Sequence, residues 1–238
     1  AYDIFEKNNK VGGNWVFNSA TGHSSVYENT HIISSRTMSE YEDYPMPTTY
    51  PDYPRHDHLQ AYFENYSKHF GVYENIKFHH TVDHVSKDAN GKWQVEYTDN
   101  QGNKHTKIYD YLMVSNGHHW MPKYPNYDGE FTGKWMHSHD FKGVTDEWRD
   151  KKILVIGAGN SGCDVAVESA RVSKHIYISM RSPQWFVPKF MLGYPADILV
   201  KALEKLSPKT RQKLLTKMVK AFTGNYADFG LPVNTKPM

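Results

Sequence analysis

A glycine-rich turn between an apolar run and a helical pattern constrains the fold of this chain more than any other feature. The apolar run is Lys152 to Ile156, and the turn that follows it is GAGNSG at residues 157–162. The next residues predict a helix from Asp164 to Arg171 and a second strand from His175 to Ser179. We expect the first strand to be buried and the whole segment to form a compact βαβ unit.

The three glycines of this turn have distinct roles if the unit binds a dinucleotide. Gly157 allows the tight turn, Gly159 lets the backbone approach a pyrophosphate, and Gly162 lets the helix lie close to the strand. The first N–H groups of the helix and its dipole would attract the phosphates. The alternative interpretation is a plain strand-turn-helix joint without a ligand.

The end of the second strand indicates which dinucleotide the unit would bind. An NAD site usually has an acidic residue about twenty residues after the turn, where it binds the ribose 2′-hydroxyl. Here the segment Ser179 to Ser182 contains no acid, and Arg181 stands near that position. A guanidinium can bind a 2′-phosphate through two hydrogen bonds. The sequence therefore predicts NADPH, and a solvated arginine at a strand end is the alternative.

The rest of the chain reads as a mixture of loops, helices and a β-meander. Serine, threonine, tyrosine and proline dominate Val26 to Pro54, which we expect to be loop and short helical turns. Apolar spacing predicts a helix from His58 to Phe70, capped by Gly71. The remaining predicted elements are meander strands at Val82–Val85, Trp93–Tyr97 and His105–Val114, and basic amphipathic helices at Ala196–Leu206 and Pro208–Phe222, with Ser207 as N-cap.

Composition excludes several classes of function. A net charge of +2 is too small to indicate nucleic-acid binding, and no apolar run reaches the length of a membrane span. The start of the chain lacks a signal-peptide pattern and Cys163 is the single cysteine, so we expect a cytoplasmic protein without a redox cysteine pair. The 14 histidines include adjacent pairs that chelate poorly, and we expect no metal site. Membrane-surface contact by the basic helices is possible but less favoured than a solvated face.

Several motifs together resemble one enzyme family. Residues Phe131 to Phe141 fit the pattern FxGxxxHxxx(F/Y), and they precede the GAGNSG turn. FEK at residues 5–7 with GGNW at 12–15, YEDYPMP at 41–47 and SNGH at 115–118 are similar to further stretches of that family. The matches cover nearly the whole chain in order. The chain thus resembles the flavin-containing monooxygenases.

This resemblance implies an α/β fold with two Rossmann-like dinucleotide-binding domains and a small antiparallel β-meander. Residues 1–144 would be a partial FAD-binding domain containing the meander, and residues 145–238 a partial, inserted NADPH-binding domain with a helical insert. The implied function is an NADPH- and FAD-dependent monooxygenase that oxygenates a soft nitrogen or sulfur nucleophile through a flavin hydroperoxide. Its partners would be O₂ and a small amine, sulfide or ketone, and the cofactors would carry the chemistry.

The resemblance also implies residue roles. Glu6 would bind the FAD ribose, Asn14 and Trp15 would lie near the flavin nucleotide, and Val82 would contact adenine. Many family members have an asparagine near the reactive flavin carbon; an ungapped alignment places Ile33 there, and Asn29 lies four residues earlier. His137 would be structural, at the joint between the domains. The full set of implied cofactor-binding residues is Glu6, Gly13, Asn14, Trp15, Ile32, Ile33, Val82, Gly117, Gly157, Gly159, Asn160, Ser161, Gly162, Cys163, Asp164, Arg181 and Ser182.

The family's first flavin phosphate turn would precede Tyr2, and its closing flavin-domain strands would follow Met238. We therefore expect the chain as given to be an inactive portion of a longer enzyme. The alternatives from other classes are a non-catalytic NADP(H)-binding module and an NADPH oxidase-type flavoprotein. The sequence assigns no oligomeric state.

Overall fold

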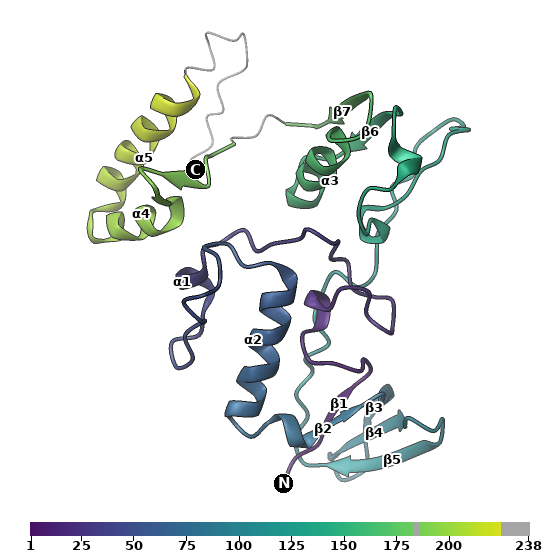
Figure 1. The fold of residues 1–238 in the computed structure, drawn as a ribbon. Helices are drawn as coiled ribbons and strands as arrows, with labels where there is room; N and C mark the ends of the chain where they lie inside the picture. The colour runs from purple at the N-terminus through teal and green to yellow at the C-terminus, as the bar shows by residue number, and fades with distance from the viewer. Residues whose placement is uncertain (183–185, 225–238) are drawn as a thin grey trace.

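The computed structural model describes residues 1–182 and 186–224. Figure 1 shows the β-meander at the bottom, the strands and helix of residues 152–179 at the upper right and the last two helices at the upper left. We call residues 1–144 the N-terminal half. We call residues 152–182 the nucleotide unit. The prediction of an α/β fold with a small antiparallel sheet is confirmed.

The N-terminal half begins with a two-stranded parallel sheet. Strand β1 (Ile4–Glu6) pairs with β2 (Ile76–Phe78), in the register Ile4 to Ile76. The 3-10 helix η1 (Gly13–Trp15) follows β1 and contains most of the GGNW motif. Between η1 and β2 the chain forms the short helix α1 (Arg36–Ser39), the long helix α2 and the 3-10 helix η2 (Tyr73–Asn75). The prediction of loop with short helical turns before Pro54 is thus confirmed.

Helix α2 (His56–His69) carries the main apolar core. It begins two residues earlier than predicted, and Gly71, whose φ is +63°, follows its end. Leu59 and Tyr62 are each 1% exposed and pack with Met46 from the preceding loop. The Tyr62 hydroxyl donates to the Tyr44 carbonyl at 2.5 Å and accepts from the backbone N–H of Tyr41 at 2.8 Å. The helix is therefore fixed to the loop by both apolar and polar contacts.

The predicted β-meander is present as an antiparallel sheet in the order β3-β4-β5. Its strands are β3 (Thr81–Lys87), β4 (Trp93–Thr98) and β5 (Lys104–Tyr109). The prediction that the third strand continues to Val114 is wrong, because β5 ends at Tyr109 and the side chains of Tyr111, Met113 and Val114 are 92%, 88% and 71% exposed. Residues 110–114 have an apolar pattern that suits a strand, but among the described residues no strand pairs with them.

Asp3 connects the two sheets of the N-terminal half. Its carboxylate accepts hydrogen bonds from Lys107 Nζ at 2.6 Å and from the Tyr109 hydroxyl at 2.5 Å, and pairs with Lys77 Nζ at 2.9 Å. These donors hold the pKa of the Asp3 carboxyl well below its ordinary value. The segment before β1 is thereby tied to β2 and β5.

A loop with two 3-10 helices, η3 (Ser138–Asp140) and η4 (Asp146–Trp148), leads from the N-terminal half to the nucleotide unit. His137 Nδ1 accepts the backbone N–H of His139 at 3.0 Å, which caps η3. The Lys142 ammonium donates to the carbonyls of Ser24 at 2.5 Å and His139 at 3.2 Å, and burial lowers its pKa. His139, whose Nε2 contacts the His23 carbonyl at 3.2 Å, and Lys142 thus hold this loop against residues 23 and 24, while His137 caps η3, in keeping with a structural role for His137.

The nucleotide unit consists of β6 (Lys152–Ile156), helix α3 (Asn160–Ala170) and β7 (His175–Ser179), with the two strands parallel. Both strands have the predicted bounds, and the helix starts four residues earlier than predicted. The prediction of a buried first strand is wrong, since Leu154 and Ile156 are 59% and 57% exposed. Side chains alternate along a strand. Helix α3 therefore covers the face that carries Val155 and leaves the opposite face open.

The last described part holds a small hairpin and two helices. Strands β8 (Phe190–Met191) and β9 (Tyr194–Pro195) precede α4 (Ala196–Ala202), η5 (Leu203–Lys205) and α5 (Pro208–Thr223). The Ser207 hydroxyl accepts the Thr210 N–H, so the predicted N-cap is confirmed. The first predicted helix ends earlier, at Ala202. Residues 225–238, which the sequence assigned to the second domain, lie outside the described residues.

Candidate nucleotide-binding site

The glycine turn joins the carboxyl end of β6 to the start of α3. Gly157 has a φ of +104°, a conformation that favours glycine, and its N–H donates to the carbonyl of Ser179 at 2.8 Å. This hydrogen bond ties the turn to the end of the neighbouring strand β7. The turn is therefore fixed to both strands of the unit.

Gly162 and Gly159 allow two different close approaches. A Cβ built at Gly162 would lie 2.3 Å from the carbonyl oxygen of Gly157, so the helix can approach the turn only with glycine there. A Cβ at Gly159 would meet no protein atom within 4 Å, and the φ of this residue is −73°. The space beside Gly159 is thus open, as a site for a pyrophosphate requires.

The first turn of α3 presents free backbone donors to that space. Its N-cap residue is Gly159, and no side chain caps the helix end. Asn160 and Ser161 are exposed at the surface. N–H groups at an uncapped helix start, together with the helix dipole, form an anion-binding site. The residues present therefore fit the phosphates of a dinucleotide.

The next two side chains of α3 contact protein. Cys163 Sγ donates to the Ala158 carbonyl at 3.5 Å. Asp164 is half-buried beside Tyr27, and burial raises its pKa. Burial and the neighbouring Asp164 also raise the pKa of the Tyr27 hydroxyl. These two candidates contact protein atoms, whereas Gly159, Asn160 and Ser161 are exposed beside the open space.

Arg181 and Ser182 follow directly after β7 and are exposed. Ile156 pairs with Ser179 in the parallel sheet, so the carboxyl ends of both strands meet at the same edge. The structure therefore places Arg181 at the edge that holds the glycine turn. Bound nucleotides in open α/β sheets lie at this edge.

Three of the predicted flavin residues lie near the sheets or in the loop that follows the meander. Glu6 ends β1, and its Oε1 accepts the Asn8 N–H at 2.7 Å. The carbonyl of Glu6 accepts the His80 N–H at 3.0 Å, which brings it near the start of the meander, where Val82 lies 43% exposed on β3. Gly117 lies in an exposed loop with a φ of +68°.

Around η1 the predicted flavin residues contact the protein core. Asn14 Oδ1 accepts from the N–H and the hydroxyl of Ser25 at 2.7 and 2.9 Å, while Gly13 is exposed with a φ of +52°. Trp15 and Ile32 pack against the Leu59 core, which makes them core side chains in this structure. Each of these contacts fixes the loop in which the predicted residues lie.

Ile33 and Asn29, the two residues expected nearest the reactive part of the flavin, lie in different environments. The Ile33 side chain is 67% exposed. The Asn29 side chain is engaged, because its Nδ2 donates to Glu168 Oε2 on helix α3 at 2.9 Å. The two residues thus belong to one loop, but the Asn29 side chain is hydrogen-bonded to α3 whereas Ile33 is exposed without such a contact to α3 among the described residues.

The sequence reasoning missed Glu168 and Tyr27. Glu168 is only 6% exposed and Tyr27 7% exposed, although the first is a charged residue of a helix. The signal was the spacing of Asp164 and Glu168, because residues four apart on a helix share a face. No group of three metal-binding side chains occurs among residues 1–182 and 186–224.

The turn, the uncapped helix and the parallel strands define a dinucleotide-binding α/β protein. The model of one family, described as flavin-binding monooxygenase-like, matches residues 2–236. The chain therefore belongs to the flavin-binding monooxygenase-like family, and the resemblance drawn from its motifs is confirmed. Members of this family are flavin-dependent monooxygenases that use FAD and NADPH.

Characterised relatives agree with this assignment. The chain is 35% identical over 207 residues to flavin-containing monooxygenase 5 of Rattus norvegicus. This alignment covers 82% of this chain and 38% of the rat protein. The S-allyl-L-cysteine S-oxygenase of Allium sativum superposes with a TM-score of 0.71 at 26% identity, covering 81% of this chain and 48% of the garlic chain. The chain thus spans less than half the length of these relatives.

The predicted cytoplasmic location is wrong. The relatives are mammalian flavin-containing monooxygenases, which are membrane-associated microsomal enzymes. The prediction relied on the single cysteine and on the start of the chain, and neither feature reports membrane association. In the part of the chain that the structure describes, no helix has the length and apolarity to cross a bilayer.

Proposed function

We propose that this chain provides the NADPH site and part of the FAD site of a monooxygenase that oxygenates a soft sulfur or nitrogen atom of a small molecule. The observation that carries the proposal is the open glycine turn at an uncapped helix start, with Arg181 at the same sheet edge. FAD and NADPH supply the oxygen-activating and reducing chemistry when bound. The protein's residues bind and orient these groups.

Each proposed residue has a task that its position supports. The N–H groups after Gly159 would bind the pyrophosphate of NADPH, and Arg181 would bind the 2′-phosphate. Glu6, at the end of β1, would accept hydrogen bonds from the FAD ribose. The division near residue 144 into a flavin part and a nucleotide part belongs to this proposal.

The names of two relatives indicate which substrate atoms this family oxygenates. The garlic relative is named for S-oxygenation of S-allyl-L-cysteine, and a human relative, 35% identical, is named as a putative N-oxide-forming dimethylaniline monooxygenase. Both names describe oxygen transfer to a heteroatom with a lone pair. We therefore propose small sulfides and amines, with O₂, as substrates.

Arg181→Ala in the full chain tests the nucleotide assignment. The loss of a charge-assisted contact should weaken NADPH binding by about 1 to 3 kcal/mol and leave NADH binding nearly unchanged. Calorimetry measures both affinities. Lys174→Ala is the matched control, because it removes an exposed cation just before the opposite end of β7. Equal losses for both nucleotides in Arg181→Ala would remove this residue from the 2′-phosphate site.

Product analysis of the full protein tests the reaction. NADPH oxidation with a methyl sulfide should yield one sulfoxide per NADPH consumed. Quantitative hydrogen peroxide with no sulfoxide would instead identify an NADPH oxidase.

A further inference from the structure

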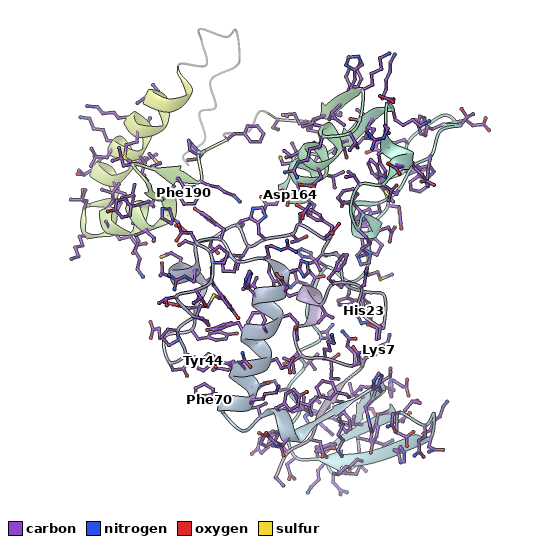
Figure 2. The ribbon with its side chains drawn as sticks, in the orientation of Figure 1. Lys7, His23, Tyr44, Phe70, Asp164 and Phe190 are labelled. Atoms are coloured by element: carbon purple, nitrogen blue, oxygen red, sulfur yellow. The ribbon has the colours of Figure 1, made fainter. Side chains whose placement is uncertain are left out.

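Helix α3 contacts the N-terminal half through two acidic side chains on one face. Asp164 and Glu168 are four residues apart, so both point the same way from the helix. Figure 2 shows Asp164 on the side of α3 that faces the N-terminal half. Tyr27 lies beside the Asp164 carboxylate, and Asn29 Nδ2 donates to Glu168 Oε2 at 2.9 Å. The helix that begins at the glycine turn is thus joined to the loop before Ile32.

The donor side of this contact is a β-turn, residues 27–30, which we call the docking turn. The Thr30 N–H donates to the Tyr27 carbonyl at 2.9 Å, and the Tyr27 N–H donates to Thr30 Oγ1 at 2.8 Å. The Glu28 carbonyl accepts His56 Nε2 at 3.0 Å, and the Thr30 carbonyl accepts the His56 N–H at 2.9 Å. Because its backbone is hydrogen-bonded to His56 at the start of α2, the docking turn keeps its position relative to that helix.

Glu168 is the buried member of the contact. Both of its oxygens have partners: Oε2 accepts from Asn29, and Oε1 pairs with Arg171 Nη2 at 3.3 Å. A buried carboxylate that loses one of its partners is strongly disfavoured. The position of Asn29 is therefore coupled to that of helix α3, and Asn29 lies four residues before the exposed Ile33.

We propose that Asn29 and Glu168 are positioning residues that dock the 27–30 turn on helix α3. Through this contact, helix α3 of the nucleotide unit fixes the position of Ile32 and Ile33 in the N-terminal half. This inference deepens the proposed function and rests on it for the identity of the two ligands. The docking itself depends only on the hydrogen bond and the burial. The amide of Asn29 joins the two parts of the chain, and the exposed Ile33 side chain lies four residues further along the same loop.

Hydrogen exchange of the full chain without nucleotide tests the docking. Glu168→Ala should speed backbone exchange across residues 27–33 by about tenfold, because the direct contact between Asn29 and the buried Glu168 carboxylate is lost. Glu168→Gln retains an acceptor for Asn29 and should restore slow exchange. Val167→Ala is the matched control, since its side chain is 59% exposed on the same helix. Wild-type exchange in Glu168→Ala would overturn the proposal.

A second variant covers the case in which Glu168→Ala does not fold. Asn29→Ala removes the same hydrogen bond from a surface turn and should speed exchange in the same peptide. If Asn29→Ala leaves exchange unchanged, the docking contact is refuted.

Addition of NADP⁺ tests the coupling to the ligand. In wild type and Glu168→Gln, NADP⁺ should slow exchange across residues 27–33, and in Asn29→Ala it should slow exchange only around the glycine turn. Failure of wild type to bind NADP⁺ would overturn the proposed function and leave the ligand-free result standing. Binding without any protection of residues 27–33 in wild type would overturn the coupling alone.

Discussion

The N-terminal half and the nucleotide unit obtain their burial in different ways. The N-terminal half has its own core, in which Leu59 and Tyr62 are almost completely buried between α2 and the preceding loop. The nucleotide unit has two strands and one helix, and Leu154 and Ile156 on its open face are more than half exposed. Its best-buried residues include Ser169 and Glu168 of α3, at 0% and 6% exposure.

This difference shows that the nucleotide unit depends on its neighbour. Glu168 accepts a hydrogen bond from Asn29, and Asp164 lies beside Tyr27, so the buried face of the helix is buried in part against the N-terminal half. A βαβ unit with one helix covers only one face of its sheet. The N-terminal half therefore packs around its own core, whereas the nucleotide unit is buried in part by contacts with the N-terminal half.

The largest effect should come from truncating the self-packed core. Leu59→Ala should lower the free energy of unfolding by about 2 to 5 kcal/mol, because it leaves a cavity beneath Tyr62. Leu154→Ala removes the same atoms from an exposed face and should stay within about 0.5 kcal/mol of wild type. Urea denaturation of both variants measures the contrast. Similar losses would mean that the face of Leu154 is covered in the full protein.

Two alanine substitutions separate the fold of the glycine turn from its ligand. Gly162→Ala should destabilise the nucleotide unit by about 1 to 3 kcal/mol, because its Cβ would collide with the carbonyl oxygen of Gly157. Gly159→Ala has free space and an ordinary φ, so the melting temperature should not change while NADPH binding weakens. Thermal melts and calorimetry distinguish the two. An unchanged NADPH affinity in Gly159→Ala would contradict the placement of the pyrophosphate.

The smallest effect concerns the charge at the joint between the regions. Burial raises the pKa of Asp164, so the folded protein holds this proton more tightly than the unfolded chain does. The stability from this group is complete below its ordinary pKa and is lost as the pH rises through the raised pKa. Asp164→Asn carries no charge and can still accept from Tyr27. It should melt higher than wild type at neutral pH, with an advantage that vanishes in acid.

The sign of this pH dependence is the critical result. A melting difference between Asp164→Asn and wild type that grows on acidification would mean that the carboxylate is stabilised, not penalised, at the joint. Asp146→Asn provides the control, since its side chain is 94% exposed.

The sequence by itself determined many of the local elements and the backbone form of the glycine turn. The bounds of β6 and β7, the cap at Ser207 and the meander turns follow from short-range signals: strand-forming runs, an N-cap residue and glycines that adopt a positive φ. The motifs also gave the family correctly, because they are short, specific and in order along the chain.

Only the tertiary structure decided which of these elements are buried and what joins them. The apolar pattern of Lys152 to Ile156 predicted a buried strand, but burial depends on neighbours that a single strand does not encode. The hydrogen bond between Asn29 and Glu168 spans 139 residues of sequence, and no local pattern specifies such a pair. Local propensity acts over a few residues, whereas burial and long-range hydrogen bonds arise when distant segments pack together.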